Sequence, residues 1–372
     1  MQIPLKLSYN PETKIKLCQS PFYNYRFDGK TGEFMRWGKT FEDDPKIGAL
    51  EIFDLEVSTI CHGIGEGPCK HCYKSNTAKG ENMSLATFQT IFNKLPPTLT
   101  QIAFGVGDLD ANPDLLAMFE YCHNNDHNPG VIPNLTINGF GLTDEWIANF
   151  KKYCGGIAVS VYALKEVCYD AVARLLAAGI TQVTIHLLIA EETLDFCREV
   201  IEDVTSDPRL ADLKALMFLT LKPKGKRNYY HTVKSLATYR EMINLAFAKG
   251  LNIGFDSCAA PTFLAATKDH PAFAMFSQMS ESCESNRFSG YANVKGEYWH
   301  CSFTEGMPGW APINLLEIGD FGREVWSSAE VNKFRAKLLG SEQLEIAPEC
   351  YLCPIFDLYG TEVCQARPEL AS

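Results

Sequence analysis

Two features that would place this protein in or across a membrane are missing from its sequence. No stretch of the 372 residues approaches the roughly 18 consecutive apolar residues that a membrane-spanning helix needs. Met1 is not followed by a basic segment that leads into an apolar one, as in a secretory signal. We therefore expect a cytoplasmic protein with no membrane partner.

Basic residues are also scarce. The chain has 34 Lys and Arg against 45 Asp and Glu, which gives a formal net charge of −11. A nucleic-acid surface needs a basic face to neutralise phosphates, so we expect no nucleic-acid partner. The local exception is the basic run Lys222-Pro-Lys224-Gly-Lys226-Arg227. With 46% hydrophobic and 21% charged residues, the chain has the composition of a globular protein with one large domain and a smaller one.

Cysteine, in contrast, is abundant, with 14 residues. In a reducing compartment such residues act as thiolate ligands or as small buried side chains more often than as disulfides. Five of them occur in apolar or helical surroundings and are expected to be packing residues: Cys18, Cys122, Cys154, Cys168 and Cys197.

Three further cysteines, Cys61, Cys69 and Cys72, share one Gly-rich loop that follows the apolar run 51–57. Three thiolates can hold three corners of an iron–sulfur cube, and with no fourth cysteine nearby one iron stays open to a ligand. Four of the seven residues between Cys61 and Cys69 are Gly or Pro, which lets the loop fold tightly. The alternative is a zinc site built from Cys69-x2-Cys72 and the distant pair Cys350 and Cys353, although zinc ribbons usually bring their pairs within about 15–20 residues.

Hydrophobic periodicity predicts a β-hairpin near the start of the chain and then an α/β pattern. Alternating residues at 22–27 and 33–37 flank a Gly-bearing turn, so residues 1–50 form a hairpin that serves as a lid or brace. From residue 51, short strands alternate with amphipathic helices, as in a parallel sheet with helical crossovers. Periodicity does not separate a doubly wound sheet from a barrel. The expected strands are 51–58, 101–104, 134–137, 157–162, 182–189 and 215–221, and the expected helices are 84–95, 113–124, 143–152, 165–178, 193–204 and 233–249.

Local signals also predict where some of these helices begin and end. Ser84 and Thr143 stand where an N-cap is needed, because their hydroxyl oxygens can accept from the first backbone N–H groups. Gly179 and Gly250 stand where a left-handed C-cap residue is needed.

The cysteine loop resembles the cluster loop of the radical S-adenosylmethionine (radical SAM) enzymes, in which the open iron binds the amino acid end of SAM. It departs from the commonest form, since seven residues rather than three separate the first two cysteines and His71 replaces the usual aromatic before the last. The resemblance implies a partial (β/α)6 TIM-like barrel over residues 51–256, with function at the carboxyl ends of the strands.

Several segments at those strand ends are similar to SAM-binding motifs of that family. Gly105-Val106-Gly107-Asp108 corresponds to a Gly-Gly-Glu motif that receives the SAM amino group, although Gly-x-Gly-Asp is also a plain turn. The resemblance assigns Asn138, Ser160, His186 and Tyr73 to the same SAM site. As alternatives, Asn138 begins an ordinary turn, Ser160 is an interior strand residue and His186 is a satisfied core histidine.

The chain beyond residue 256 resembles an auxiliary-cluster domain. The pattern Cys283, Gly296, Cys301, then Cys350-x2-Cys353 looks like the twitch domain, which implies a four-cysteine site for a second cluster over residues 257–372. The longer SPASM form would add cysteines where Tyr359 and Val363 stand. Cys258 and Cys364 are left over, as alternative ligands or a radical partner.

The resemblance implies that SAM is cleaved to methionine and a 5′-deoxyadenosyl radical that takes a hydrogen atom from a substrate. It implies two 4Fe–4S clusters and a reductant such as flavodoxin or ferredoxin. We favour a peptide residue that is oxidised or cross-linked, first because the auxiliary-cluster enzymes that the chain resembles act mostly on peptides. The sequence adds a little, since Arg287-Phe288, Tyr291 and Tyr298-Trp299 offer an aromatic-rich surface and the hairpin at 23–37 could add an edge strand. As an alternative, these aromatic residues belong to the core. The alternatives are a radical dehydrogenase or modifier of a small molecule, and a non-catalytic zinc or iron–sulfur redox-sensing protein.

Overall fold

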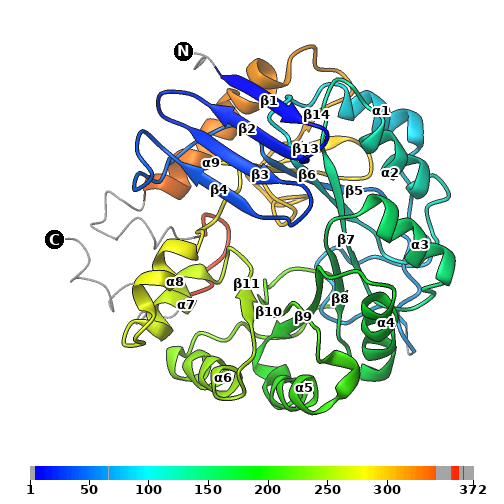
Figure 1. Cartoon of the computed structure of the whole chain (residues 1–372), viewed down its shortest axis with the longest axis vertical. Helices are drawn as coiled ribbons and strands as arrows, with labels where there is room; N and C mark the ends of the chain where they lie inside the picture. The colour runs from blue at the N-terminus through cyan, green and yellow to red at the C-terminus, as the bar shows by residue number, and fades with distance from the viewer. Residues whose placement is uncertain (1–4, 66, 341–352, 360–362, 364–372) are drawn as a thin grey trace.

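The computed structural model describes residues 5–65, 67–340, 353–359 and 363 (Figure 1). These residues form two sheets, a four-stranded antiparallel sheet and a ten-stranded sheet. None of the helices in this part of the chain is long and apolar enough to cross a membrane.

The antiparallel sheet contains β1 (Lys6–Asn10), β2 (Ile15–Gln19), β3 (Asn24–Asp28) and β4 (Phe34–Trp37) in that order. The predicted hairpin is confirmed as β3 and β4, in which Phe27 lies opposite Phe34. The sequence reading missed β1 and β2, which double the size of this unit. Alternate residues of β3 and its approach, Tyr23, Tyr25 and Phe27, are buried against Phe288 from the far end of the chain.

All six predicted barrel strands are present, each within a few residues of its expected bounds. These strands are parallel, and their order in the sheet follows their order in the chain. In a doubly wound sheet, the strand order would instead reverse at a switch point. The barrel alternative is therefore the correct one. The strands are β5 (Ile52–Glu56), β6 (Gln101–Gly105), β7 (Ile132–Ile137), β8 (Ile157–Ser160), β9 (Val183–Ile189) and β10 (Ala215–Thr220).

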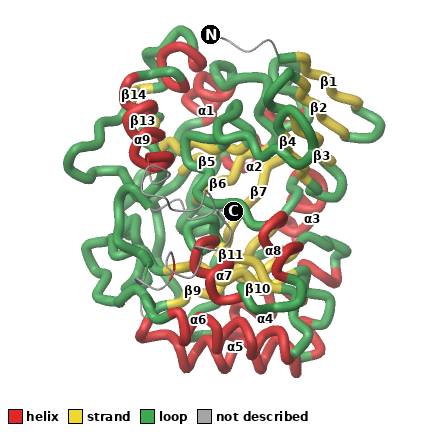
Figure 2. The backbone as a smooth tube through the Cα atoms, turned by 90° about the vertical axis from the view of Figure 1, so that its left-hand side faces the viewer, coloured by secondary structure: helices red, strands yellow, loops and turns green. Residues whose placement is uncertain are grey.

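The crossover helices lie outside the strands, with α5 beside β9 and α6 beside β10 (Figures 1 and 2). The predicted caps are confirmed: the hydroxyls of Ser84 and Thr143 accept from Thr87 N and Trp146 N, and Gly179 and Gly250 have φ of +81° and +72°. The helices are α1 (Leu85–Phe92), α2 (Leu115–His123), α3 (Asp144–Tyr153), α4 (Lys165–Ala177), α5 (Leu194–Ser206) and α6 (Leu236–Ala248).

The C-terminal part continues the barrel sheet at both of its edges. Strand β11 (Ile253–Phe255) pairs in parallel with β10, and β12 (Ser289–Ala292) returns to pair in parallel with β5. The sheet therefore runs across the boundary expected at residue 256. The remaining elements are α7 (Ala260–Thr267), α8 (Phe273–Met279), β13 (Glu297–Trp299), β14 (Ile313–Asn314), a short π-helix (Gly322–Trp326) and α9 (Ala329–Leu339).

The core lies between the barrel strands and their helices. On β5, Phe53 and Leu55 face this core, so the alternate residues Asp54 and Glu56 face the barrel interior. The five cysteines expected to be packing residues are all in or against hydrophobic clusters, four of them buried and Cys154 partly buried.

Candidate functional site

A cavity of about 700 Å³ opens at the carboxyl ends of the barrel strands. The cysteine loop borders it on one side, and residues from the C-terminal part border it on the other. This is the end of a parallel barrel at which ligands bind, because loops and strand ends converge there. Every barrel strand from β5 to β10 contributes at least one lining residue.

Cys61, Cys69 and Cys72 all line this cavity, as the spacing of the loop predicts. Gly63 has a φ of +78°, and a Cβ at this position would lie 1.9 Å from Gly67 O, so the long loop folds back on itself as expected. Burial raises the pKa of the Cys61 thiol to about 11, and the charges of Asp108, Cys69 and Cys72 raise it further. Three thiolates in this loop need positive charge to hold them, which an iron–sulfur cluster would supply.

The basic run at 222–227 supports this loop. The backbone N of Lys226 donates to Ser75 Oγ at 2.8 Å, and Arg227 Nη2 donates to Asn76 O at 2.9 Å. Lys224 Nζ donates to the carbonyls of Ser302, Phe303 and Glu305, at 3.2, 3.1 and 2.8 Å. These residues connect the cysteine loop to the C-terminal part. In the sequence they are marked by the basic run at 222–227.

Of the residues assigned to SAM, six line the cavity: Tyr73, Gly105, Gly107, Asn138, Ser160 and His186. Gly107 has no room for a side chain, since a Cβ would lie 2.1 Å from Ile60 O, just before Cys61. Burial lowers the pKa of His186 to about 4, so the imidazole is neutral.

Asp108 lies apart from these residues, because it is not among the lining residues of the cavity. One of its oxygens accepts from His62 N at 2.8 Å and lies 2.6 Å from His62 Nδ1. Its other oxygen is buried with no hydrogen-bond partner in the described part of the chain. The carboxylate therefore holds the cysteine loop in this structure.

The second group of thiols gathers at the opposite side of the cavity. Cys283, Cys301 and Cys353 line it as predicted, and Cys258 joins them there. Burial raises the pKa of Cys258 to about 12, and the charges of Cys353 and Cys301 act in the same direction. The predicted ligand Cys350 and the spare thiol of Cys364 lie outside the described residues.

The donor set of this group fits a cluster better than one ion. Within the described ranges, no three His, Cys, Asp or Glu side chains converge closely enough to hold a single metal ion. Four partly buried thiols that interact electrostatically and line one cavity suit a cubane, which holds its thiolates farther apart than one ion does.

An ion-pair network that the sequence reading missed lies between the two thiol groups. Lys74 Nζ lies 3.0 Å from Glu56 and is paired with Glu305. Tyr291 Oη donates to Glu305 at 3.0 Å, and Asn293 Nδ2 donates to the same carboxylate at 3.0 Å. Its only signal in the sequence was the position of Lys74, two residues after Cys72.

The aromatic-rich surface predicted near the auxiliary site is wrong. Phe288, Tyr298 and Trp299 are 1%, 1% and 7% exposed, and Arg287 is 1% exposed, so these side chains belong to the core. Return of β12 to the barrel buries them. Tyr291 alone lines the cavity.

No family model and no curated protein matches the sequence. Solved structures match its fold. SuiB from Streptococcus suis has a TM-score of 0.67 at 11% identity, over 96% of this chain and 100% of SuiB. The structure of SuiB bound to precursor peptide SuiA has a TM-score of 0.64 at 13% identity, over 86% of this chain and 77% of SuiB. Native anSMEcpe with bound AdoMet (SAM) and Cp18Cys peptide has a TM-score of 0.59 at 16% identity, over 86% of this chain and 95% of anSMEcpe.

These neighbours are radical SAM enzymes with SPASM domains. At such identities the likeness concerns the fold, which is the one that the cysteine-loop resemblance implied. The chain thus has the partial TIM-barrel fold of the radical SAM enzymes, with an antiparallel sheet added at its N-terminus.

Proposed function

We propose that this protein is a radical SAM enzyme with two iron–sulfur clusters, acting on a residue within a peptide. The observation that carries the proposal is that one cavity of about 700 Å³ is lined by both groups of thiols. Cys61, Cys69 and Cys72 would hold the SAM-binding cluster. The auxiliary cluster would be held by Cys283, Cys301 and Cys353, with Cys258 or Cys350 as the fourth ligand.

The cluster on the first three cysteines would supply the electron that splits SAM into methionine and a radical able to remove a substrate hydrogen atom. The chain's own residues bind and orient. The backbone at Gly105 and Gly107 lines the cavity beside the cysteine loop, where its polar groups would meet the amino acid end of SAM. Asn138, Ser160 and the neutral His186 offer hydrogen bonds from three adjacent strands.

A peptide substrate is supported by the neighbours. SuiB and anSMEcpe have both been solved with bound peptides.

Anaerobic reconstitution with iron and sulfide, followed by metal analysis and reduction in the presence of SAM, tests the proposal. We expect about eight irons per chain and 5′-deoxyadenosine as a product. The triple variant Cys61→Ala, Cys69→Ala, Cys72→Ala should keep about half the iron and form no 5′-deoxyadenosine. Cys154→Ala, which changes a packing thiol, should match the wild type. Zinc as the bound metal, or no SAM cleavage by the iron-loaded wild type, would overturn the proposal.

A further inference from the structure

Asp54 is a carboxylate inside the barrel that nothing in the proposed cluster chemistry uses. It lies in the middle of β5, is accessible through the cavity, and has buried neighbours on both sides, Phe53 and Leu55. No hydrogen-bond donor or cation in the described part of the chain contacts it. Burial, and then the charge of Glu284, raise its pKa to about 7.

The neighbouring strands leave space beside Asp54. Its partner on β6 is Ala103, which is too small to reach it. Its partner on β12 is Tyr291, whose hydroxyl is engaged with Glu305 and Lys74. Neither of these described strand partners offers Asp54 a free donor, which leaves the position open to a polar group of a molecule in the cavity.

The charges around Asp54 favour a cation. The two lysines among the described lining residues are already paired, Lys74 with Glu56 and Glu305, and Lys222 with Asp256. Asp54 lies among protein atoms inside the barrel and meets solvent through the cavity, so a bound cation with N–H donors would stabilise its charge.

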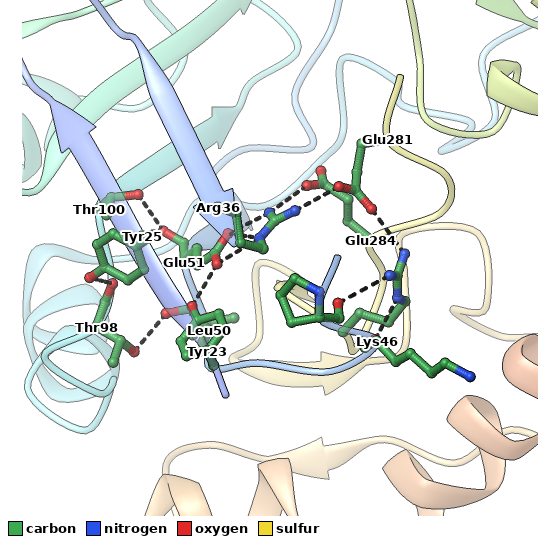
Figure 3. A network of polar contacts seen from close by, with 12 residues as sticks. Tyr23, Tyr25, Arg36, Lys46, Leu50, Glu51, Thr98, Thr100, Glu281 and Glu284 are labelled. Carbon is green, nitrogen blue, oxygen red and sulfur yellow. Dashed lines mark hydrogen bonds and ion pairs between the residues drawn. The ribbon is translucent and has the colours of Figure 1, made fainter. Parts of the chain in front are cut away.

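A second ionic network also acts on Asp54. Arg36 pairs with Glu51, Glu281 and Glu284 (Figure 3), and Arg287 pairs with Glu281. Glu284, one of the three, is the charge that acts on Asp54.

We propose that Asp54 recognises an ammonium or guanidinium group on the substrate from which the enzyme removes hydrogen. The inference rests on the proposed radical SAM function and names the substrate class. SAM also carries an ammonium group, but the proposal places that group at Gly105, the last residue of β6, and at Gly107 just after it. Asp54 lies two residues before Glu56, the partner of Gly105, and so is farther from this end of the strand.

Calorimetric titration of the cluster-loaded, SAM-bound enzyme tests the inference with two matched pairs of probes. The charged probes are Nα-acetyl-lysine N-methylamide and Nα-acetyl-arginine N-methylamide. Their neutral counterparts, with norleucine and citrulline, have similar shapes. We expect each charged probe to bind the wild type about 10- to 100-fold more tightly than its counterpart, as for one charge-assisted hydrogen bond.

Asp54→Asn should abolish this preference without changing iron content or the affinity for SAM. Asp212→Asn, which removes the same charge from an exposed position, should behave as the wild type. Equal binding of charged and neutral probes by the wild type, or an unchanged preference in Asp54→Asn, would overturn the inference. So would a loss of SAM affinity in Asp54→Asn, because it would assign the carboxylate to SAM.

These outcomes are independent of SAM cleavage. If the wild type prefers cationic probes but yields no 5′-deoxyadenosine on reduction, the proposed function fails and the recognition by Asp54 stands. If it yields 5′-deoxyadenosine without preferring cationic probes, the inference alone fails.

Discussion

Replacing Arg36 with Met should destabilise the folded protein by about 3–5 kcal/mol at pH 7, as for loss of one partner from a buried ion pair. Arg36 on β4 donates to the fully buried Glu51 from Nη2 at 2.6 Å and from Nε at 2.9 Å (Figure 3). Without Arg36, the Glu51 carboxylate keeps one described partner, the Tyr23 hydroxyl at 2.6 Å.

The magnitude can be worked from the proton that Glu51 would then take up. Protonating a carboxyl with an ordinary pKa of 4.5 costs about 3.4 kcal/mol at pH 7, since each pH unit adds about 1.36 kcal/mol. In the variant, burial holds the folded-state pKa of Glu51 above its unfolded value. The stability that this raised pKa contributes is present below pH 4.5 and is lost as the pH rises. The destabilisation should therefore shrink to about 1 kcal/mol at pH 5.

Urea denaturation followed by tryptophan fluorescence at pH 5, 6 and 7 measures this difference. Arg36→Lys is the matched control, because it keeps a positive charge beside Glu51 but loses the forked geometry of the guanidinium. Its stability should lie between those of the wild type and Arg36→Met. Arg36 also pairs with Glu281 and Glu284, which lie on either side of Cys283 in the chain. The variant should therefore also hold less iron at the proposed auxiliary site. A loss that does not change with pH, or one below about 1 kcal/mol at pH 7, would refute the reasoning.

Three further predictions concern the cysteine loop and the N-terminal sheet. Gly225→Ala should lower the iron held by the cysteine loop, because the added Cβ would lie 2.3 Å from Cys72 O. Gly141→Ala is the control: Gly141 also has a positive φ, but the space around it is open, so this variant should retain full iron. Asp108→Asn should likewise lower iron content because the carboxylate anchors His62; lowered SAM affinity at full iron would instead place Asp108 against SAM. Burial lowers the pKa of Lys16 to about 7, so folding becomes more favourable as pH rises from about 7 to 10.5. We expect the wild type to gain stability relative to Lys16→Met by up to about 1.4 kcal/mol per pH unit in that window, measured as the difference between their unfolding free energies. If this difference does not change with pH, Lys16 is not neutral in the folded protein.

Local signals in the sequence were sufficient for the barrel and for the three cysteines that its loop brings to one cavity. A helix cap such as Ser84 depends on residues within one turn, so it can be read without the rest of the chain. The six strands are apolar runs of the length that a buried parallel strand needs, and the structure has each of them. Cys61, Cys69 and Cys72 lie within twelve residues, so their convergence needed only a loop rich in glycine.

Two errors came from contacts between distant segments. The aromatic residues at 288–299 look like a surface when their segment is considered alone, and the pairing of β12 with β5 buries them. Strands β1 and β2 were missed because Lys16 and other polar residues interrupt their pattern. Lys16 is buried there because the carbonyls of Leu99 and Pro129 accept hydrogen bonds from its Nζ, and no sequence neighbour could reveal this.

The sequence by itself determined the strand and helix pattern, the cysteine loop and three of the auxiliary thiols, because each is carried by spacing along the chain. Only the tertiary structure decided which charges meet. It brought Cys258 to the auxiliary thiols, paired Lys74 with Glu56 and Glu305, and left Asp54 facing the cavity. The physical reason is that an ion pair or a ligand set depends on distance in space. The separations here run from 18 residues for Lys74 and Glu56 to 231 for Lys74 and Glu305, and no local signal sets such distances.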